Sequence, residues 1–402
     1  MIQYNRNPRN RFCWHFAFNS NLMKHVNGVK KMIVSPIIDD LGINTFHLDE
    51  KSQQTDYKIK YVTEYVRRWL QVSVNREDIR NINFMDCMSN AGIYKDGEFG
   101  TPIIVFQLFI DNARQNPSIN FNLFINDNDK SRVEICKKVM DFLCQDKPMN
   151  LSIFCANSDV NDYLEGFSQF DRYFRSKPSS LVFIDPYNAG TVRLTRISSF
   201  LKRYYCEVIF NFFTSDVVRN GVNNKIRECI GDSDIKSKDD LLRYLISNLK
   251  VGFIKFSFSY QFRTSTNTEI YQIVFFTPHT KGLEKLKEAL WQTFNGRFYH
   301  RNHSEDQLQL ITDEEEQSLL IELHSKFAKE SLSRRFSGQS KKYSEISAYL
   351  IENTMLKESD FLRHVIKPLM IEGLIQKRNI TGNPNNYKGD DYFIEGESNE
   401  RD

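Results

Sequence analysis

The middle of the chain alternates between short apolar runs and longer amphipathic stretches, which predicts strands separated by helices. The apolar runs have strand length and lie at 82–86, 120–126, 150–156, 180–185 and 207–213. The amphipathic stretches that follow them predict helices at 103–112, 130–143, 159–170, 193–202 and 239–249. Strands that alternate with helices in this way favour a mostly parallel sheet with right-handed crossovers.

Two further apolar runs, 252–262 and 269–276, are separated only by the polar segment 263–267, which predicts a β-hairpin. A helix is predicted over 281–295. A parallel sheet that ends in a hairpin is typical of an α/β fold with a Rossmann-like, class I methyltransferase sheet and helices on both faces. Ahead of the sheet, apolar residues at helical spacing predict a helix over 51–74, and the segment 33–41 is predicted to be extended or loop-like around Pro36.

The last part of the chain predicts a small separate unit. A charged helix over 313–332 leads to helices at 343–352 and 357–372 and strands at 374–379 and 392–394. Two helices followed by a two-stranded wing predict a C-terminal winged-helix domain. The expected domains are therefore an N-terminal extension (1–50), a methyltransferase-type domain (51–300), a helical linker (301–340) and a winged-helix domain (341–396).

Composition narrows the class of protein. The 402 residues carry a net charge of only +3, which does not itself argue for a nucleic-acid partner, although local patches still allow one. The seven cysteines form no CxxC pair, which fits reduced thiols in a cytoplasmic protein. No apolar run approaches the roughly 20 residues of a membrane helix, so we expect no membrane association.

The first candidate site is the turn after the strand at 82–86. Asp86 ends the strand, and the small residues Asn90, Ala91 and Gly92 lead into the next helix. Small residues that tolerate a left-handed backbone let a nucleoside cofactor approach the backbone N–H groups closely. The alternative is an ordinary strand-to-helix turn.

Two more polar turns follow the second and third predicted strands, at positions equivalent to the first turn. Asp127 and Asp129 lie where the second strand ends, and an acid there can accept hydrogen bonds from both ribose hydroxyls. Ser158 and Asp159 follow the third strand, where a carboxylate can read an adenine amino group. For these two residues the alternative is that they cap the next helix.

The fourth and fifth strands predict the substrate side of the site. Asp185, Pro186, Tyr187 and Asn188 follow a run of apolar residues, and this combination can hold a flat base and accept a hydrogen bond from an amine. Asn211 lies within an aromatic strand, where a buried amide needs partners. Arg219 lies one or two helical turns further on. Either Asn211 or Arg219 contacts substrate or phosphate, or both only satisfy hydrogen bonds within the core.

Other site chemistries have little support. The eight histidines do not pair as HxxxH or HExxH, and the chain has neither a GxSxG elbow nor a phosphate loop. We predict no metal site. A weaker hypothesis is a nuclease-like site that uses Asp86, Asp127 and Asp185 as metal ligands.

Several of these segments resemble, in order, the three-Cys-motif partner protein family. The turn at 90–103 resembles the family signature of a small-residue turn, a glycine, then Tyr, Asp-Gly-Glu, Gly and Thr-Pro. Lys58 resembles an early family lysine, 183–187 a strand ending in Ile-Asp-Pro, and 207–219 a strand with Asn211 that leads to Arg219. The resemblance implies an S-adenosylmethionine-dependent methyltransferase fold found beside a cysteine-motif protein partner in phage-related or genome-defence settings.

The chain departs from this family in the first turn. The family's first glycine is Asn90 here, and its acid in the second strand corresponds to Asn126 or Asp127. The leading hypothesis is a methyltransferase acting on nucleic acid, with Asp185, Tyr187 and Asn211 as catalytic residues. Its cofactor would lie on Asp86, Asn90, Ala91, Gly92, Asp127, Ser158 and Asp159, and its substrate on Lys58, Pro186, Asn188 and Arg219. The second hypothesis is a degenerate fold that serves as a nucleic-acid- or protein-binding subunit of a defence complex.

Overall fold

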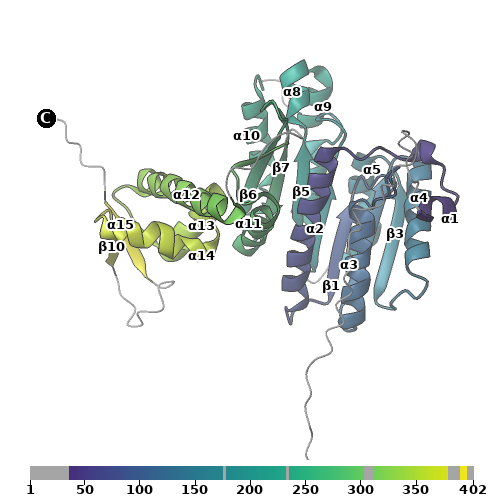
Figure 1. Cartoon of the computed structure of the whole chain (residues 1–402), viewed down its shortest axis with the longest axis horizontal. Helices are drawn as coiled ribbons and strands as arrows, with labels where there is room; N and C mark the ends of the chain where they lie inside the picture. Colours follow the sequence, from purple (N-terminus) through teal and green to yellow (C-terminus); the bar gives the residue numbers. More distant parts are fainter. Residues whose placement is uncertain (1–35, 175–177, 232–234, 303–311, 379–389, 396–402) are drawn as a thin grey trace, which may run out of the picture.

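A computed structural model describes residues 36–174, 178–231, 235–302, 312–378 and 390–395. Its centre is an eight-stranded sheet with the strand order β3-β2-β1-β4-β5-β7-β6-β8 (Figure 1). The strands are β1 (Asn81–Asp86), β2 (Asn120–Asp127), β3 (Leu151–Asn157), β4 (Ser179–Ile184), β5 (Glu207–Phe212), β6 (Phe256–Arg263), β7 (Glu269–Thr277) and β8 (Tyr299–Arg301). The first five are parallel, and β7 is antiparallel to both β5 and β6. The prediction of a mostly parallel α/β sheet with a hairpin is therefore confirmed.

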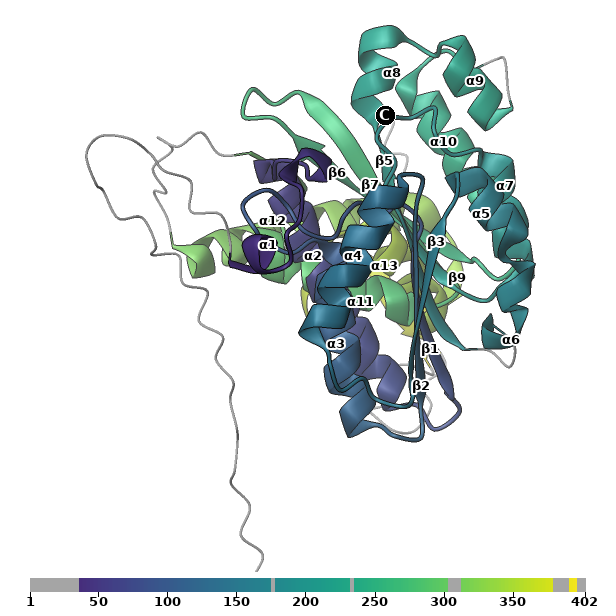
Figure 2. The same ribbon diagram turned by 90° about the vertical axis from the view of Figure 1, so that its right-hand side faces the viewer.

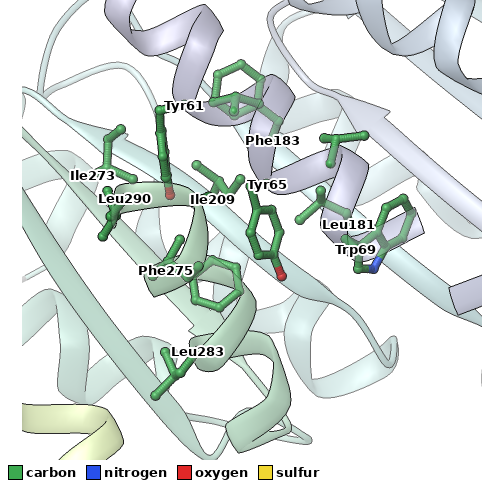
Figure 3. Packing of buried hydrophobic residues seen from close by; sticks show 14 of the residues in the cluster. Tyr61, Tyr65, Trp69, Leu181, Phe183, Ile209, Ile273, Phe275, Leu283 and Leu290 are labelled. Carbon is green, nitrogen blue, oxygen red and sulfur yellow. The ribbon is translucent and has the colours of Figure 1, made fainter. Parts of the chain in front are cut away.

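Helices cover both faces of this sheet (Figure 2). One face carries α2 (Gln53–Val74), α3 (Thr101–Gln115), α4 (Lys130–Leu143) and α11 (Thr280–Phe294). The other carries α5 (Val160–Glu165), α7 (Leu194–Arg203), α9 (Asn224–Ile230) and α10 (Lys238–Leu249). Figure 3 shows Tyr61, Tyr65 and Trp69 of α2 lying against the sheet, and this packing fixes the helix that carries Lys58.

The C-terminal unit contains the predicted helices and hairpin. Its elements are α12 (Asp313–Phe336), β9 (Ser340–Lys342), α13 (Tyr343–Asn353), α14 (Glu358–Phe361), a π-helical turn (Leu362–Ile366), α15 (Lys367–Ile371), β10 (Ile375–Arg378) and β11 (Asp391–Ile394). The short strand β9 extends the hairpin to three strands and was not predicted. Trp291 of α11 donates a hydrogen bond to the Met355 carbonyl at 2.8 Å, which ties the unit to the sheet domain.

Two local expectations need correction, and two others fall partly outside the described residues. Residues Pro36–Asp40 form the short helix α1 rather than an extended segment, because proline is tolerated in the first turn of a helix. The helix predicted over 159–170 stops at Glu165, and Gly166 begins a 3₁₀ segment (Gly166–Phe170) that leads to α6 (Asp171–Phe174). Residues 1–35 of the expected N-terminal extension and 303–311 of the expected linker lie outside the described residues. In the described part, no helix is long and apolar enough to cross a membrane.

Candidate functional site

The parallel strands bring three of the predicted acids to one edge of the sheet. Asp86 and Asp127 are the last residues of β1 and β2, and Asp185 directly follows β4. The strand order turns back between β1 and β4, since β2 and β3 lie on one side of β1 and β4 and β5 lie on the other. Ligands of open α/β sheets bind outside the carboxyl ends of the strands at such a switch point.

Asp185 is held by two side chains from different elements. The Lys58 ammonium on α2 lies 2.5 Å from Asp185 Oδ2, and Asn211 Nδ2 on β5 donates to Asp185 Oδ1 at 2.7 Å. The Asn211 amide is oriented by this bond, because a carboxylate only accepts. Its own Oδ1 is buried and has no hydrogen-bond partner in the described residues. A buried acceptor of this kind can take a hydrogen bond from a donor group of a ligand.

The Asp86 side chain is more buried than that of Asp185, and its electrostatic surroundings differ. Its side chain is buried, and Oδ1 accepts a hydrogen bond from the Met88 N–H at 3.2 Å. Burial raises the pKa of Asp86 well above its ordinary value, and the nearby charges of Asp185 and Asp127 raise it further. The edge therefore combines a buried carboxyl group of raised pKa with a carboxyl group that pairs with a lysine.

The turn after β1 adopts the left-handed backbone that its small residues predicted. Asn90 has φ +56° and Gly92 has φ +71°. The Asn90 N–H donates to Asp127 Oδ2 at 2.8 Å, and the Ala91 N–H donates to Asn90 Oδ1 at 2.6 Å. A Cβ at Gly92 would lie 2.9 Å from Cys136 Sγ, so close helix packing also requires glycine here. Asp127 thus supplies the carboxylate that contacts the first turn.

Asn126 serves the site indirectly. Its Nδ2 donates to the carbonyls of Cys87 and Ser158, each at 3.0 Å, and its Oδ1 accepts from the Ser158 N–H at 3.1 Å. These bonds join the turns that follow β1 and β3. Asn126 therefore fixes the spacing between the two turns rather than facing a ligand.

Two of the predicted acids cap helices. Asp159 Oδ1 accepts from the Asn161 N–H at 2.8 Å, and Asp129 Oδ1 accepts from the Ser131 N–H at 2.8 Å. For Asp159 the capping alternative is the contact that the structure contains. Adenine recognition by Ser158 or Asp159 stays a prediction.

The remaining predicted residues lie in the loop after β4 and on α8 (Thr214–Asn220). Pro186 is buried, and Asn188 Oδ1 accepts from the Gly190 N–H and the Thr191 hydroxyl at 3.1 and 3.0 Å. Asn188 thereby shapes the loop that presents Tyr187. Arg219 is on α8, and its side chain lies outside the described part of the structure.

Sequence reasoning missed a charged cluster that covers this edge. Asp49, in the loop between α1 and α2, lies 2.9 Å from the Arg132 guanidinium of α4 and accepts from Asn90 Nδ2 at 2.5 Å. Arg132 also donates to the Tyr187 hydroxyl. Burial raises the pKa of Tyr187 to about 12, although 55% of the residue is exposed. No local pattern marks Asp49, because its partners are remote in sequence.

Tyr94 completes the surroundings of the acids. Burial raises the pKa of its hydroxyl, and the charges of Asp185 and Asp49 raise it further, so the phenol stays neutral. Among the described residues, no group of three or more His, Cys, Asp or Glu side chains is placed to hold a metal ion. Asp86, Asp127 and Asp185 thus share one edge without forming a metal cluster.

Comparisons with known proteins give only distant likenesses. No family model matches the chain, and no curated protein matches its sequence. Protein LPL1258 from Legionella pneumophila is 10% identical, with a TM-score of 0.35 over 60% of this chain and 92% of that one. The methyltransferase domain of bacterial CtHen1 is 12% identical, with a TM-score of 0.29 over 54% of this chain and 98% of that one.

A candidate class I S-adenosylmethionine-dependent methyltransferase from Listeria monocytogenes is 11% identical, with a TM-score of 0.28 over 59% of this chain and 62% of that one. Likenesses this weak carry no argument about the site. Its interpretation therefore rests on the residues of this chain.

Proposed function

We propose that this chain is an S-adenosylmethionine-dependent methyltransferase that acts on nucleic acid. The observation that carries the proposal is the arrangement at the switch point of the sheet. There Asp86, Asp127 and Asp185 meet on one edge, and Asn211 Oδ1, buried beside Asp185, has no hydrogen-bond partner in the part of the chain that the structure describes. Acceptors of this kind suit a nucleoside with its hydroxyl and amino donors.

The hydrogen-bonding groups at the turns that follow β1 and β2 fit the nucleoside half of the cofactor. Each oxygen of Asp127 accepts one backbone N–H, from Asn90 or from Asp129. A carboxylate has about four lone-pair positions, so Asp127 keeps acceptor capacity for the two ribose hydroxyls. Asp86, whose pKa burial raises, ends the strand that leads into the same turn. When bound, the cofactor supplies the methyl group.

The β4 and β5 side of the edge fits an amine substrate. Asn211 Oδ1 and the Asp185 carboxylate can both accept N–H bonds from an exocyclic amino group, and this pairing turns the nitrogen lone pair toward the cofactor side. Lys58 holds the carboxylate in place. Methyl transfer is an in-line displacement, so positioning of the two reactants is the main task of these residues.

A nucleic-acid base is the amine substrate that the surroundings favour. The half-exposed Tyr187 ring offers a stacking surface at the same edge, and base–aromatic stacking is worth about 1–3 kcal/mol. A base within a duplex would have to be flipped out to reach Asp185. The C-terminal unit, which the sequence predicts to be a winged helix, fits the same partner. Its Lys341, Lys342 and Arg378 could contact phosphates, although acids lie between them.

One observation favours a second candidate function, a binding subunit without catalysis. The Asn90 side chain stands where the resembling family has a glycine, and it bonds to Asp49, which also pairs with Arg132. This cluster occupies the mouth of the cofactor turn. A degenerate methyltransferase fold that binds nucleic acid or a protein partner in a defence complex would tolerate such closure.

Transfer of a labelled methyl group separates the two functions. We expect the purified full chain to transfer label from S-adenosylmethionine to RNA or DNA, and Asn211→Ala to lower kcat about 100-fold because one oriented acceptor is lost. Asn122→Ala removes another buried amide of the same sheet, away from this edge, and is the matched control for stability. If no label is transferred to RNA or DNA, the methyltransferase proposal fails and the binding-subunit function remains. Normal transfer by Asn211→Ala would refute the role of Asn211.

A further inference from the structure

Helix α12 exposes an apolar stripe along one side of the helix. Leu319, Leu323 and Phe327 follow one another at spacings of four residues and are 50%, 46% and 48% exposed. On the opposite side of the helix, Ala328 and Leu332 are buried. Large apolar side chains gathered on one face mark an interaction surface, whereas single exposed ones do not.

The stripe continues beyond the helix. Phe298 is 47% exposed, and its ring centroid lies 3.9 Å from that of His324 on α12. Phe298 and Phe327 also line a cavity of about 580 Å³ between the sheet domain and the C-terminal unit, together with Met355. An apolar side chain from a partner could therefore insert beside the stripe.

Charge along α12 is opposite at its two ends. The first turn carries Asp313, Glu314, Glu315 and Glu316, and the last turn carries Arg334 and Arg335. The helix dipole accounts for this distribution within one chain, but it does not account for the exposed stripe between the ends. Leu323 lies close to the middle of the helix, and Glu322 and Lys326 flank the stripe with opposite charges, both exposed.

We propose that two copies of this chain associate by antiparallel packing of their α12 helices. An apolar stripe centred on the helix is self-complementary under a twofold axis, which is the geometry of most homodimers. Antiparallel packing at about 20° puts the acidic first turn of one copy beside the arginines of the other, and Glu322 of one beside Lys326 of the other. A parallel pair would bring like charges together.

Sedimentation velocity of the full chain over a concentration series tests this proposal. We expect a concentration-dependent dimer in the wild type and a dissociation constant at least 100-fold higher for Leu323→Glu, which puts two charges at the centre of the contact. Phe142→Glu is the matched control, because Phe142 is 44% exposed on α4 and lies on the sheet domain rather than on the C-terminal unit. It should leave the dimer unchanged.

Charge exchange makes the test independent of the folding of Leu323→Glu. Glu322→Lys and Lys326→Glu should each weaken the dimer about tenfold, and the double variant should restore it, because opposite charges again meet across the axis. A wild type that stays monomeric at all concentrations, a Leu323→Glu variant that dimerises normally, or a double variant weaker than both single ones would each overturn the proposal.

Discussion

The pair of Lys58 and Asp185 offers a quantitative test of the site geometry. Lys58→Met removes the ammonium but keeps a side chain of similar length on α2. The two charged groups are 2.5 Å apart, and their side chains are only 14% and 18% exposed. At an effective dielectric constant of about 20, the gross attraction at this distance is about 6–7 kcal/mol, and desolvation of both groups offsets most of it.

The expected net coupling lies between two measured classes. Exposed ion pairs contribute about 0.2–1 kcal/mol, and removal of one partner from a buried pair costs about 3–5 kcal/mol. A mostly buried pair that also holds Asn211 should therefore show a coupling energy of about 2 kcal/mol. The pair of Lys60 and Asp56 on the same helix is 59% and 29% exposed, and its coupling should be about 0.3–0.5 kcal/mol.

Double-mutant cycles in urea measure both couplings. The first cycle uses Lys58→Met and Asp185→Asn, and the control cycle uses Lys60→Met and Asp56→Asn, with unfolding followed by tryptophan fluorescence. The buried Trp69 on α2 reports on the sheet domain. Equal couplings in the two cycles, or a Lys58 coupling below about 0.5 kcal/mol, would show that Lys58 does not hold Asp185 and would refute the preorganised site.

Two further predictions concern Asp86 and the first turn. Burial raises the pKa of Asp86, so the folded chain holds this proton to higher pH than the unfolded chain, which loses it above pH about 4; this group therefore lowers the stability of the fold as pH rises. Asp86→Asn should gain stability relative to wild type between pH 4 and 8 in thermal unfolding scans, and a pH-independent difference would contradict this. Gly92→Ala should lower the free energy of unfolding by about 2–4 kcal/mol, because its Cβ would collide with Cys136 and Ile103 at φ +71°. The control Gly42→Ala, at φ +55° with open space around it, should lower it by only about 1–2 kcal/mol through the backbone alone. Equal losses of stability in chemical denaturation would disprove the packing argument.

Much of the fold and part of the site could be predicted from sequence, because both depend on local pattern. Short apolar runs between amphipathic stretches specify parallel strands, and parallel strands bring Asp86, Asp127 and Asp185 to one edge whatever the loops do. The buried amide of Asn211 was expected to need a partner, and the structure provides Asp185. The two three-residue strands β8 and β9 were missed, because so short a segment has no periodicity to read.

The charged cluster of Asp49 and Arg132 beside the site could not be predicted. Asp49 and Arg132 are far apart in sequence, and a charge in a loop or in the first turn of a helix is most often solvated. Their pairing arises only when the loop before α2 folds across α4. For Asp159 the sequence left two roles open, and the structure contains one of them, because its side chain accepts the Asn161 N–H at the N-cap of α5.

Calorimetric titration of the full chain with S-adenosylhomocysteine, the demethylated product of the cofactor, tests the central claim most directly. We expect saturable binding to one site, weakened about 10- to 100-fold by Asp127→Ala, because charge-assisted hydrogen bonds to the ribose are lost. Asp129→Ala, which removes the cap of α4 and a 3.9 Å ion pair with Arg132 but no bond to the turn after β1, should bind as the wild type does. Absence of binding at millimolar ligand, or equal binding by Asp127→Ala, would contradict a cofactor site at this edge of the sheet.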